Sequence, residues 1–173
     1  MQIEDATAAD AEACAAVYAP YVRDTVITFE LDPPTAQDMA RRIATAQRAH
    51  AWLVARDGDH VVGYAYGGAY HARPAYRWTC EVSIYLEPGR RRSGLGRSLY
   101  TELFARLEAR GYRTLVAGMT LPNPASEGLH AALGFERIGV SRSIGWKHDA
   151  WRDVAWCQRP IGRWDDDPPA EPR

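Results

Sequence analysis

The feature that most constrains this chain is a turn of arginines and glycines, residues 90–96, set between a β-like run and a long helical run. The preceding run, residues 82–86, is largely apolar, and leucines recur at helical spacing over residues 95–110. Glycines let the backbone approach a ligand closely, and the first amides of a helix offer N–H groups and partial positive charge. The turn therefore predicts an anion-binding site, and the expected ligand is a phosphate group.

Two better-known phosphate motifs do not fit this turn. Arg91-x-x-Gly94-x-Gly96 lacks the Gly-Lys-Ser/Thr ending of a P-loop and the first glycine of the dinucleotide fingerprint. Taken alone, the turn is about equally compatible with a glycine-rich helix start whose arginines are solvated. The choice between a phosphate site and a simple helix start depends on the neighbouring elements.

The charge balance excludes partners that a strong electric field would attract. Lys+Arg 21 against Asp+Glu 22 in 173 residues gives no overall field that would attract nucleic acid or an anionic membrane, so any basic patch must be local. Lys147 is the only lysine, and we interpret the bias towards arginine as a coding preference. We expect no nucleic-acid or membrane partner, and a chain of this length fits one domain.

The three cysteines, Cys14, Cys80 and Cys157, are far apart and show none of the paired spacings that bind zinc. We expect reduced core thiols and no metal. The first residues show no basic segment followed by an apolar run, and no window is long and apolar enough to cross a bilayer. The prediction is a soluble cytoplasmic protein.

The remaining pattern alternates strand and helix signals. A glycine-containing turn at residues 57–59 between two runs of β-formers indicates a hairpin, and Thr35 with Asp38 resembles a capping box. Pro20 is expected to end the first helix and to leave residues 21–31 as an ordered connection. We predict strands at residues 2–6, 52–56, 60–66, 79–86, 114–120, 137–146 and 151–157, and helices at residues 7–19, from 35 onward, 95–110 and 125–133.

These elements follow the order β-α-α-β-β-β-α-β-α-β-β, which is typical of a central mixed sheet flanked by helices. The predicted fold class is α/β, with a single domain over residues 1–162. Residues 163–173 are acidic and proline-rich with no apolar period, and we expect a disordered tail there.

Alternation over residues 79–86 divides that strand into two faces. Cys80 lies on the apolar face and Glu81 on the polar face. On this pattern alone, Glu81 is a solvated carboxylate and His130, a lone histidine in a short helix, is structural. Asn123, before the same short helix, is an ordinary helix cap.

The order of strand, Arg-x-x-Gly-x-Gly turn, helix, strand, Asn, short helix and Gly-Phe resembles the GCN5-related N-acetyltransferase superfamily. A closer likeness runs from about Ile3 to Pro160 and is to the phosphinothricin and methionine-sulfoximine acetyltransferases. The residues that carry it include His71-Ala72-Arg73, Tyr76, Trp78-Thr79, Glu81, Tyr85, Gly94-Leu95-Gly96, Leu99-Tyr100, Leu121-Pro122-Asn123, His130, Gly134-Phe135, Gly145, Lys147-His148 and Trp151.

This resemblance implies an acetyl-CoA-dependent N-acetyltransferase that acetylates the free amine of a small amino-acid-like substrate by direct transfer in a ternary complex. Phosphinothricin and methionine sulfoximine or sulfone are the implied acceptors, and a homodimer is the implied assembly. Other acceptors stay open: an ordinary amino acid, a polyamine or a protein N-terminus. A coenzyme-A-binding module without turnover, or a contact with RNA phosphates, stays open as well.

The resemblance also implies roles for single residues. Glu81 becomes the general base, because an α-amino group is mostly protonated at neutral pH and attacks only after losing its proton. His130 stands where the superfamily commonly has a tyrosine that protonates the leaving thiolate, which implies a supporting acid–base role. Cys80 lies on the face opposite Glu81, so no covalent intermediate is expected. The implied acetyl-CoA contacts are Ile84, Tyr85, Leu86, Arg91, Arg92, Ser93, Gly94, Leu95, Gly96, Arg97, Asn123 and Ser126.

For the acceptor, Arg73 offers a guanidinium fork that suits a carboxylate or a phosphinate. By its pattern alone, Arg73 is equally well explained as a surface-loop residue. The chain departs from the characterised subgroup at His71, where lysine is frequent, and at Met119, which borders the expected pocket. The implied acceptor residues are Phe29, His71, Arg73, Tyr76, Ser83 and Tyr85.

Overall fold

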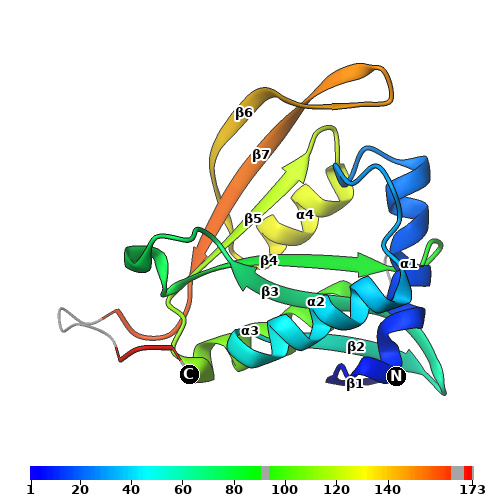
Figure 1. The fold of residues 1–173 in the computed structure, drawn as a ribbon. Helices are drawn as coiled ribbons and strands as arrows, with labels where there is room; N and C mark the ends of the chain where they lie inside the picture. The colour runs from blue at the N-terminus through cyan, green and yellow to red at the C-terminus, as the bar shows by residue number, and fades with distance from the viewer. Residues whose placement is uncertain (91–93, 165–169, 173) are drawn as a thin grey trace.

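The computed structural model describes residues 1–90, 94–164 and 170–172. It contains a seven-stranded sheet in the order β1-β2-β3-β4-β5-β7-β6 with helices on both faces (Figure 1), which confirms the mixed α/β prediction. The strands are β1 (Gln2–Asp5), β2 (Trp52–Asp57), β3 (His60–Ala69), β4 (Thr79–Leu86), β5 (Thr114–Thr120), β6 (Glu136–Lys147) and β7 (Ala150–Pro160). The helices are α1 (Ala11–Asp24), α2 (Ala36–Ala49), α3 (Leu95–Arg110) and α4 (Pro124–Ala132), with short 3-10 turns η1 (Ala8–Asp10) and η2 (Pro74–Tyr76).

The sheet consists of two arms. β1 to β4 pair antiparallel in sequence order, and β5, β7 and β6 form a second antiparallel set. The arms join through a parallel β4–β5 pair that is limited to residues 79–81 opposite residues 114–116, although both strands continue further. Figure 1 shows β5 and β7 running away from β4 beyond this point. The sheet therefore forks after Glu81.

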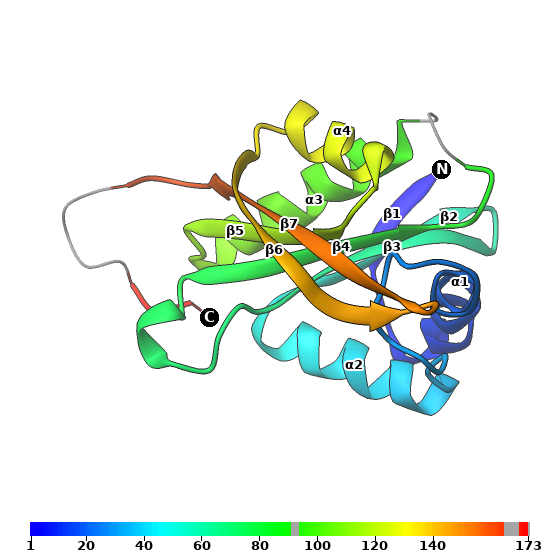
Figure 2. The same ribbon diagram turned by 90° about the horizontal axis from the view of Figure 1, so that it is seen from above.

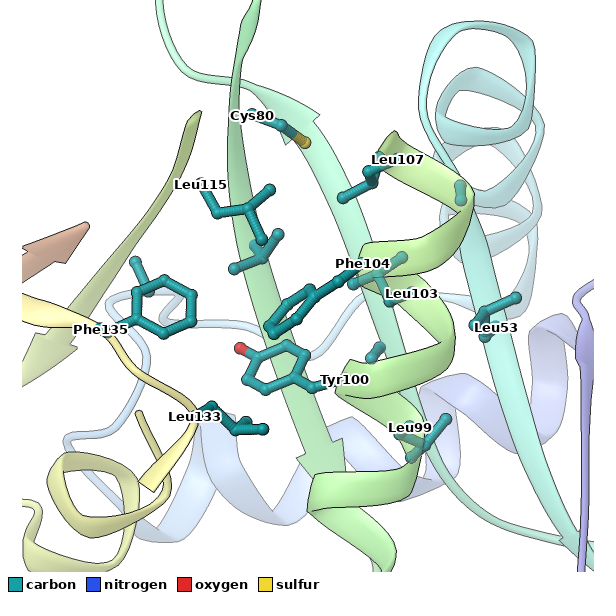
Figure 3. Packing of buried hydrophobic residues seen from close by; sticks show 14 of the residues in the cluster. Leu53, Cys80, Leu99, Tyr100, Leu103, Phe104, Leu107, Leu115, Leu133 and Phe135 are labelled. Carbon is teal, nitrogen blue, oxygen red and sulfur yellow. The ribbon is translucent and has the colours of Figure 1, made fainter. Parts of the chain in front are cut away.

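One face of the sheet is covered by α3. Its side chains Leu99, Leu103 and Leu107 are fully buried and point at the sheet in Figure 3, where Cys80 and Leu115 meet them. Burying one such leucine contributes about 1.5–3 kcal/mol. The leucine spacing thus predicts both the helix and the face that it buries.

The opposite face of the sheet is covered by α1 and α2. Met39 and Ile43 of α2 pack there with Val22 of α1 and with the strand residues Trp52 and Tyr64. The capping box predicted for α2 is present and marks where this covering helix begins: the Thr35 hydroxyl accepts from the Asp38 amide at 3.1 Å, and the Asp38 carboxylate accepts from the Thr35 amide at 3.1 Å.

Pro20 does not end α1, contrary to the prediction, because the helix continues to Asp24. An interior proline removes one helical hydrogen bond and costs about 3 kcal/mol. Packing of the following turn offsets this cost: Val22 is buried, and the Tyr21 hydroxyl donates to the Leu86 carbonyl at 2.6 Å. The irregular connection therefore begins at Thr25, four residues later than predicted.

The β6–β7 hairpin is longer than predicted. It turns through His148 and Asp149, both with φ near +50°, between the pairs Trp146↔Trp151 and Lys147↔Ala150. Figure 2 shows the hairpin crossing over β4, with its tip beside α1. It thereby brings the end of β6 to the α1–α2 connection.

Part of the predicted tail contacts the domain. The Trp78 indole N–H donates to the Ala170 carbonyl at 3.0 Å, and Arg77 forms an ion pair with Glu171. Residues 165–169 and 173 lie outside the described residues. None of the helices in the described part of the chain is long and apolar enough to cross a membrane.

Candidate active site

Glu81 lies at the apex of the fork. It is the last residue of β4 that pairs with β5, opposite Val116. Its half-buried side chain shares a sheet face with Tyr85, while Cys80 belongs to the core beneath α3. Burial raises the pKa of Glu81 above its ordinary value, and the nearby His71 imidazole opposes this rise. A raised pKa makes a carboxylate a better proton acceptor, as a general base requires.

Beyond Glu81, one edge of β4 borders the fork. β4 still pairs with β3 as far as Leu86, opposite Gly63, but no strand of the described chain pairs with its other edge. Such an edge suits an extended ligand whose amide groups continue the hydrogen-bond ladder. Ile84, Tyr85 and Leu86, which were expected to contact acetyl-CoA, lie on this stretch.

The predicted anion turn leads into α3. Gly94 has a φ of +80°, in the left-handed region that favours glycine. The Ser98 amide donates back to the Gly94 carbonyl at 3.1 Å, so the amides of Gly96 and Arg97 precede the hydrogen-bonded ladder of the helix and suit an anion. Arg91, Arg92 and Ser93 of the predicted turn lie outside the described residues.

The described arginines beside this turn bind protein groups. Arg90 forms ion pairs with Asp57 at 2.9 Å and with Glu87 at 3.3 Å. The guanidinium of Arg97 donates to the carbonyl of Ala132, the last residue of α4, at 3.3 Å. Among the described residues beside this turn, the backbone amides of Gly96 and Arg97 are therefore the groups best suited to an anion.

His130 is buried in α4 between two hydrogen-bond partners. Its Nδ1 lies 2.8 Å from the Ser126 carbonyl oxygen, which only accepts, so Nδ1 carries the proton. Its Nε2 then accepts from the Tyr100 hydroxyl at 3.3 Å. Burial lowers the pKa of His130, although the Ser126 bond opposes this, and burial raises the pKa of Tyr100 well above its ordinary value. At neutral pH the pair is a neutral histidine and a protonated tyrosine.

The start of α4, which carries the Ser126 partner of His130, is fixed by a cap. The Asn123 side-chain oxygen accepts from the Ser126 amide at 3.2 Å, which confirms the cap that the sequence predicts. Figure 3 shows Tyr100 projecting from α3 towards Leu133 and Phe135, which follow α4. Packing between α3 and the end of α4 thus holds the Tyr100–His130 contact.

The β3–β4 connection brings together some of the predicted acceptor residues. The rings of His71 and Tyr76 lie 5.1 Å apart, and each also contacts Tyr70. His71 is close enough to Glu81 to affect its pKa. Arg73 is exposed and precedes η2, where its carbonyl accepts from the Tyr76 amide at 3.0 Å.

The other predicted acceptor residues come from separate elements. Phe29, in the α1–α2 connection, rests on Gly145 of β6, whereas Ser83 and Tyr85 lie on the Glu81 face of β4. Met119, expected at the border of the pocket, is buried in the core cluster beneath α3. The predicted acceptor set is thus distributed over three parts of the fold.

A hollow of about 380 Å³ lies between the β3–β4 connection, the end of α2 and residues 171–172. His71, Tyr76 and Thr79 line it together with His50 and Tyr112, but Glu81 does not. Because this hollow lacks Glu81, the candidate base, we place the candidate site at the fork instead.

Cys80 is unsuited to act as a nucleophile. Its side chain is fully buried in the core cluster beneath α3, and burial raises its pKa to about 12. A thiol attacks as the thiolate, which this environment suppresses. No group of three or more His, Cys, Asp or Glu side chains able to hold a metal ion occurs among the described residues.

Two residues of interest carry the family resemblance but were given no role from the sequence. Tyr100 is one of them, although its hydroxyl needs a partner when buried. Lys147 was attributed to coding bias, although its being the only lysine in an arginine-rich chain was a signal that lysine is specifically suited to that position.

Known proteins resemble this chain over most of its length. A model of the GNAT acetyltransferase domain matches residues 3–156. The whole chain aligns at 39% identity with 92% of a phosphinothricin N-acetyltransferase from Streptomyces viridochromogenes. Identity is 35% to an L-methionine sulfoximine/L-methionine sulfone acetyltransferase from Pseudomonas aeruginosa, over 90% of this chain and 92% of that protein.

Among solved structures, a GNAT superfamily phosphinothricin acetyltransferase from Sinorhizobium meliloti in complex with acetyl-CoA has the same fold. The two superpose with a TM-score of 0.93 at 40% identity, covering 98% of this chain and 93% of that chain. The chain therefore belongs to the GNAT acetyltransferase family and is an acetyl-CoA-dependent N-acetyltransferase.

Proposed function

We propose that this enzyme acetylates the free amine of a small amino-acid-like acceptor, with phosphinothricin and methionine sulfoximine or sulfone as its preferred acceptors. The observation that carries the proposal is the position of Glu81: a half-buried carboxylate with a raised pKa at the apex of the fork, where an unpaired strand edge begins. The acceptor class is supported by the names of relatives at 35–40% identity.

In the proposed reaction, the acceptor ammonium gives a proton to Glu81, directly or through a water molecule. The amine nitrogen then attacks the thioester carbonyl, the new C–N bond forms and the C–S bond breaks. Coenzyme A leaves as a thiolate and takes up the second proton, which the nitrogen loses as it becomes an amide, and the proton on Glu81 passes to solvent. Transfer is direct within a ternary complex, and the buried, protonated thiol of Cys80 on the opposite face supports the absence of an acyl-enzyme.

His130 has a supporting role in this proposal. A thiolate is a weak base, so its need for an acid is modest. Since Nδ1 of His130 donates to Ser126 and Nε2 accepts from Tyr100, His130 holds the Tyr100 hydroxyl in place. Tyr100 therefore donates the hydrogen bond in this pair, and its raised pKa makes it a weak acid.

Acetyl-CoA is held in two places in this proposal. The pantetheine arm lies along the edge of β4 that no described strand pairs, at Ile84, Tyr85 and Leu86, where the Leu86 carbonyl also accepts from Tyr21. The pyrophosphate lies over residues 94–97 at the start of α3. Support comes from the unpaired edge and from the first-turn amides of α3. Asn123 and Ser126 contact the coenzyme from the start of α4.

The acceptor lies on the Glu81 face of β4. Arg73 binds its carboxylate or phosphinate through the guanidinium fork. The rings of Phe29, His71 and Tyr76 form the walls, and the polar groups of Ser83 and Tyr85 complete the site. The exposure of Arg73 and the contact between the His71 and Tyr76 rings support this assignment.

We further propose a cytoplasmic homodimer. The free, buried cysteines fit a reducing compartment. Large apolar side chains of the β6–β7 hairpin are 50–61% exposed, which favours a second copy as their cover; they are Ile138, Ile144, Trp146 and Trp151. Light scattering should give twice the 19.3 kDa chain mass, whereas the mass of one chain would contradict the dimer but not the activity.

The acceptor is tested by thiol release from acetyl-CoA over a panel of amines. We expect the highest kcat/KM with phosphinothricin, methionine sulfoximine and methionine sulfone. Ordinary amino acids, spermidine and a peptide N-terminus complete the panel. A preference for spermidine or the peptide would contradict the acceptor class, and no acetyl-CoA consumption with any amine would contradict the enzymatic proposal altogether.

A further inference from the structure

Lys147, the last residue of β6, is buried together with its charge. It is 3% exposed, and its Nζ donates to the carbonyl oxygens of Val22, Thr28 and Glu30 at 2.7, 2.8 and 2.9 Å. An ammonium group has three N–H donors, so these bonds use all of them. Burying an ammonium is costly unless it is fully bonded, and this arrangement meets that requirement.

The three carbonyls belong to the end of α1 and the connection that follows it. Val22 lies in the last turn of α1, where carbonyls lack an intrahelical partner and the helix dipole favours a cation. Thr28 and Glu30 flank Phe29 on both sides. Lys147 thus caps the C-terminal end of α1 and fixes the backbone around Phe29.

Side-chain contacts hold the same segment from the other direction. The Thr28 and Tyr18 hydroxyls lie 2.6 Å apart, and the Glu30 carboxylate accepts two bonds from Arg42 at 2.6 and 2.9 Å. The Tyr18 ring packs edge-on against Tyr85, with ring centroids 4.6 Å apart. The position of the segment is therefore linked to β4, the strand that carries the catalytic carboxylate.

The Phe29 ring rests on the same hairpin that supplies Lys147. A Cβ added to Gly145 would lie 2.3 Å from Cε2 of Phe29, so the ring sits directly on the Gly145 backbone. The hairpin that crosses over β4 in Figure 2 thus contacts the Phe29 ring through Gly145 and binds the backbone on both sides of Phe29 through Lys147. Phe29 remains 36% exposed, which leaves part of the ring accessible to a ligand.

We propose that Lys147 is a positioning residue of the acceptor site, which holds Phe29 in place and thereby sets the affinity for the acceptor amine. This inference rests on the proposed function, in which Phe29 forms one wall of that site. Lys147 touches neither reactant and acts through the backbone of residues 28–30. A small acceptor has few contacts, so displacing one aromatic wall weakens its binding strongly.

The first test is Lys147→Met, which keeps the apolar stem and removes the donors. The KM for methionine sulfoximine should rise about 10-fold or more, while the KM for acetyl-CoA stays within about twofold of the wild type. Lys147→Arg keeps the charge and the donors and should restore part of the acceptor affinity. The matched control is Gln47→Met, which removes two bonds to the backbone carbonyls of Ala6 and Trp52 and should change stability without a selective rise in the acceptor KM.

A second route reaches Phe29 without altering Lys147. Gly145→Ala places a methyl group into the Phe29 ring and should reproduce the selective rise in the acceptor KM. Gly139→Ala is its control, because a Cβ at Gly139 of the same strand has no atom within 4 Å, and its kinetics should equal the wild type. If Lys147→Met does not fold, Gly145→Ala decides in its place.

The outcomes separate the two claims. If the wild type turns over no small amino-acid-like acceptor, the proposed function is wrong. If the wild type is active but both Lys147→Met and Gly145→Ala keep the wild-type acceptor KM, or raise both KM values equally, the positioning role of Lys147 is wrong.

Discussion

Glu81 pairs with Val116 at the last register position before β4 and β5 separate. This relationship puts a carboxylate at the point where one strand edge loses its partner and becomes available to a ligand. A base and a binding edge therefore arise from the same topological feature. The thioester of an extended acetyl-CoA molecule lying along that edge would come close to the carboxylate.

The buried carboxylate should cost stability at neutral pH. Burial raises the pKa of Glu81 in the folded protein above its unfolded value, so the folded protein binds this proton more tightly. The cost is absent below the unfolded pKa and grows as pH rises through the folded pKa. Glu81→Gln should therefore show a higher Tm than the wild type at about pH 7.5 and a similar Tm at about pH 4. A Tm difference that does not change with pH would contradict the burial argument.

Tyr100→Phe should slow the reaction more than it weakens binding. The variant removes the hydroxyl that donates to His130 Nε2 at 3.3 Å, which leaves a buried nitrogen without its donor and costs about 1–3 kcal/mol of stability. We expect kcat to fall about 10-fold, with little change in the KM for acetyl-CoA. Tyr112→Phe, which removes the hydroxyl bond to the Ala49 carbonyl, is the control. Equal kcat values for the two variants would remove Tyr100 from the mechanism.

Arg73→Ala should raise the acceptor KM about 10-fold or more and leave the acetyl-CoA KM nearly unchanged, because a bidentate arginine contact with a carboxylate is lost. Stability should not change, since Arg73 is exposed. Arg77→Ala in the same connection removes an ion pair to Glu171 and serves as the control. Steady-state kinetics with each substrate varied in turn measures both constants, and equal rises in the two KM values would refute a carboxylate clamp.

Gly94→Ala should weaken acetyl-CoA binding selectively. Its φ of +80° strains any other residue by roughly 1–2 kcal/mol, and the relief of that strain shifts the first amides of α3. Gly58→Ala carries a similar backbone cost in the β2–β3 turn, at φ +60°, and is the matched control. Titration calorimetry with coenzyme A should show a loss of affinity for Gly94→Ala alone; the same affinity in both variants would place the phosphates elsewhere.

Local patterns in the sequence predict much of this fold. The leucines of α3, the alternation of β4 and the cap of α2 each depend on residues that are close in the chain, so their periods reveal them. Pro20 was misjudged because the packing of Val22 and Tyr21, rather than local propensity, decides whether α1 continues.

The parts that the sequence does not predict depend on distant contacts. The fork arises because β4 and β5 pair at only three positions, and no local period encodes where such pairing stops. Lys147 and Val22 are 125 residues apart in the chain, so their contact appears only in three dimensions. Glu81 and His130 owe their assignment to family resemblance, because each has an ordinary structural explanation in the sequence alone.

The central claim is that Glu81 is the base of the acetyl transfer at the fork. The most direct measurement is kcat for thiol release from acetyl-CoA with methionine sulfoximine, with the wild type and Glu81→Gln side by side at about pH 7.5. The account predicts a fall of about 100-fold or more in the variant, with the acetyl-CoA KM nearly unchanged. A Glu81→Gln enzyme that turns over at close to the wild-type rate would contradict it.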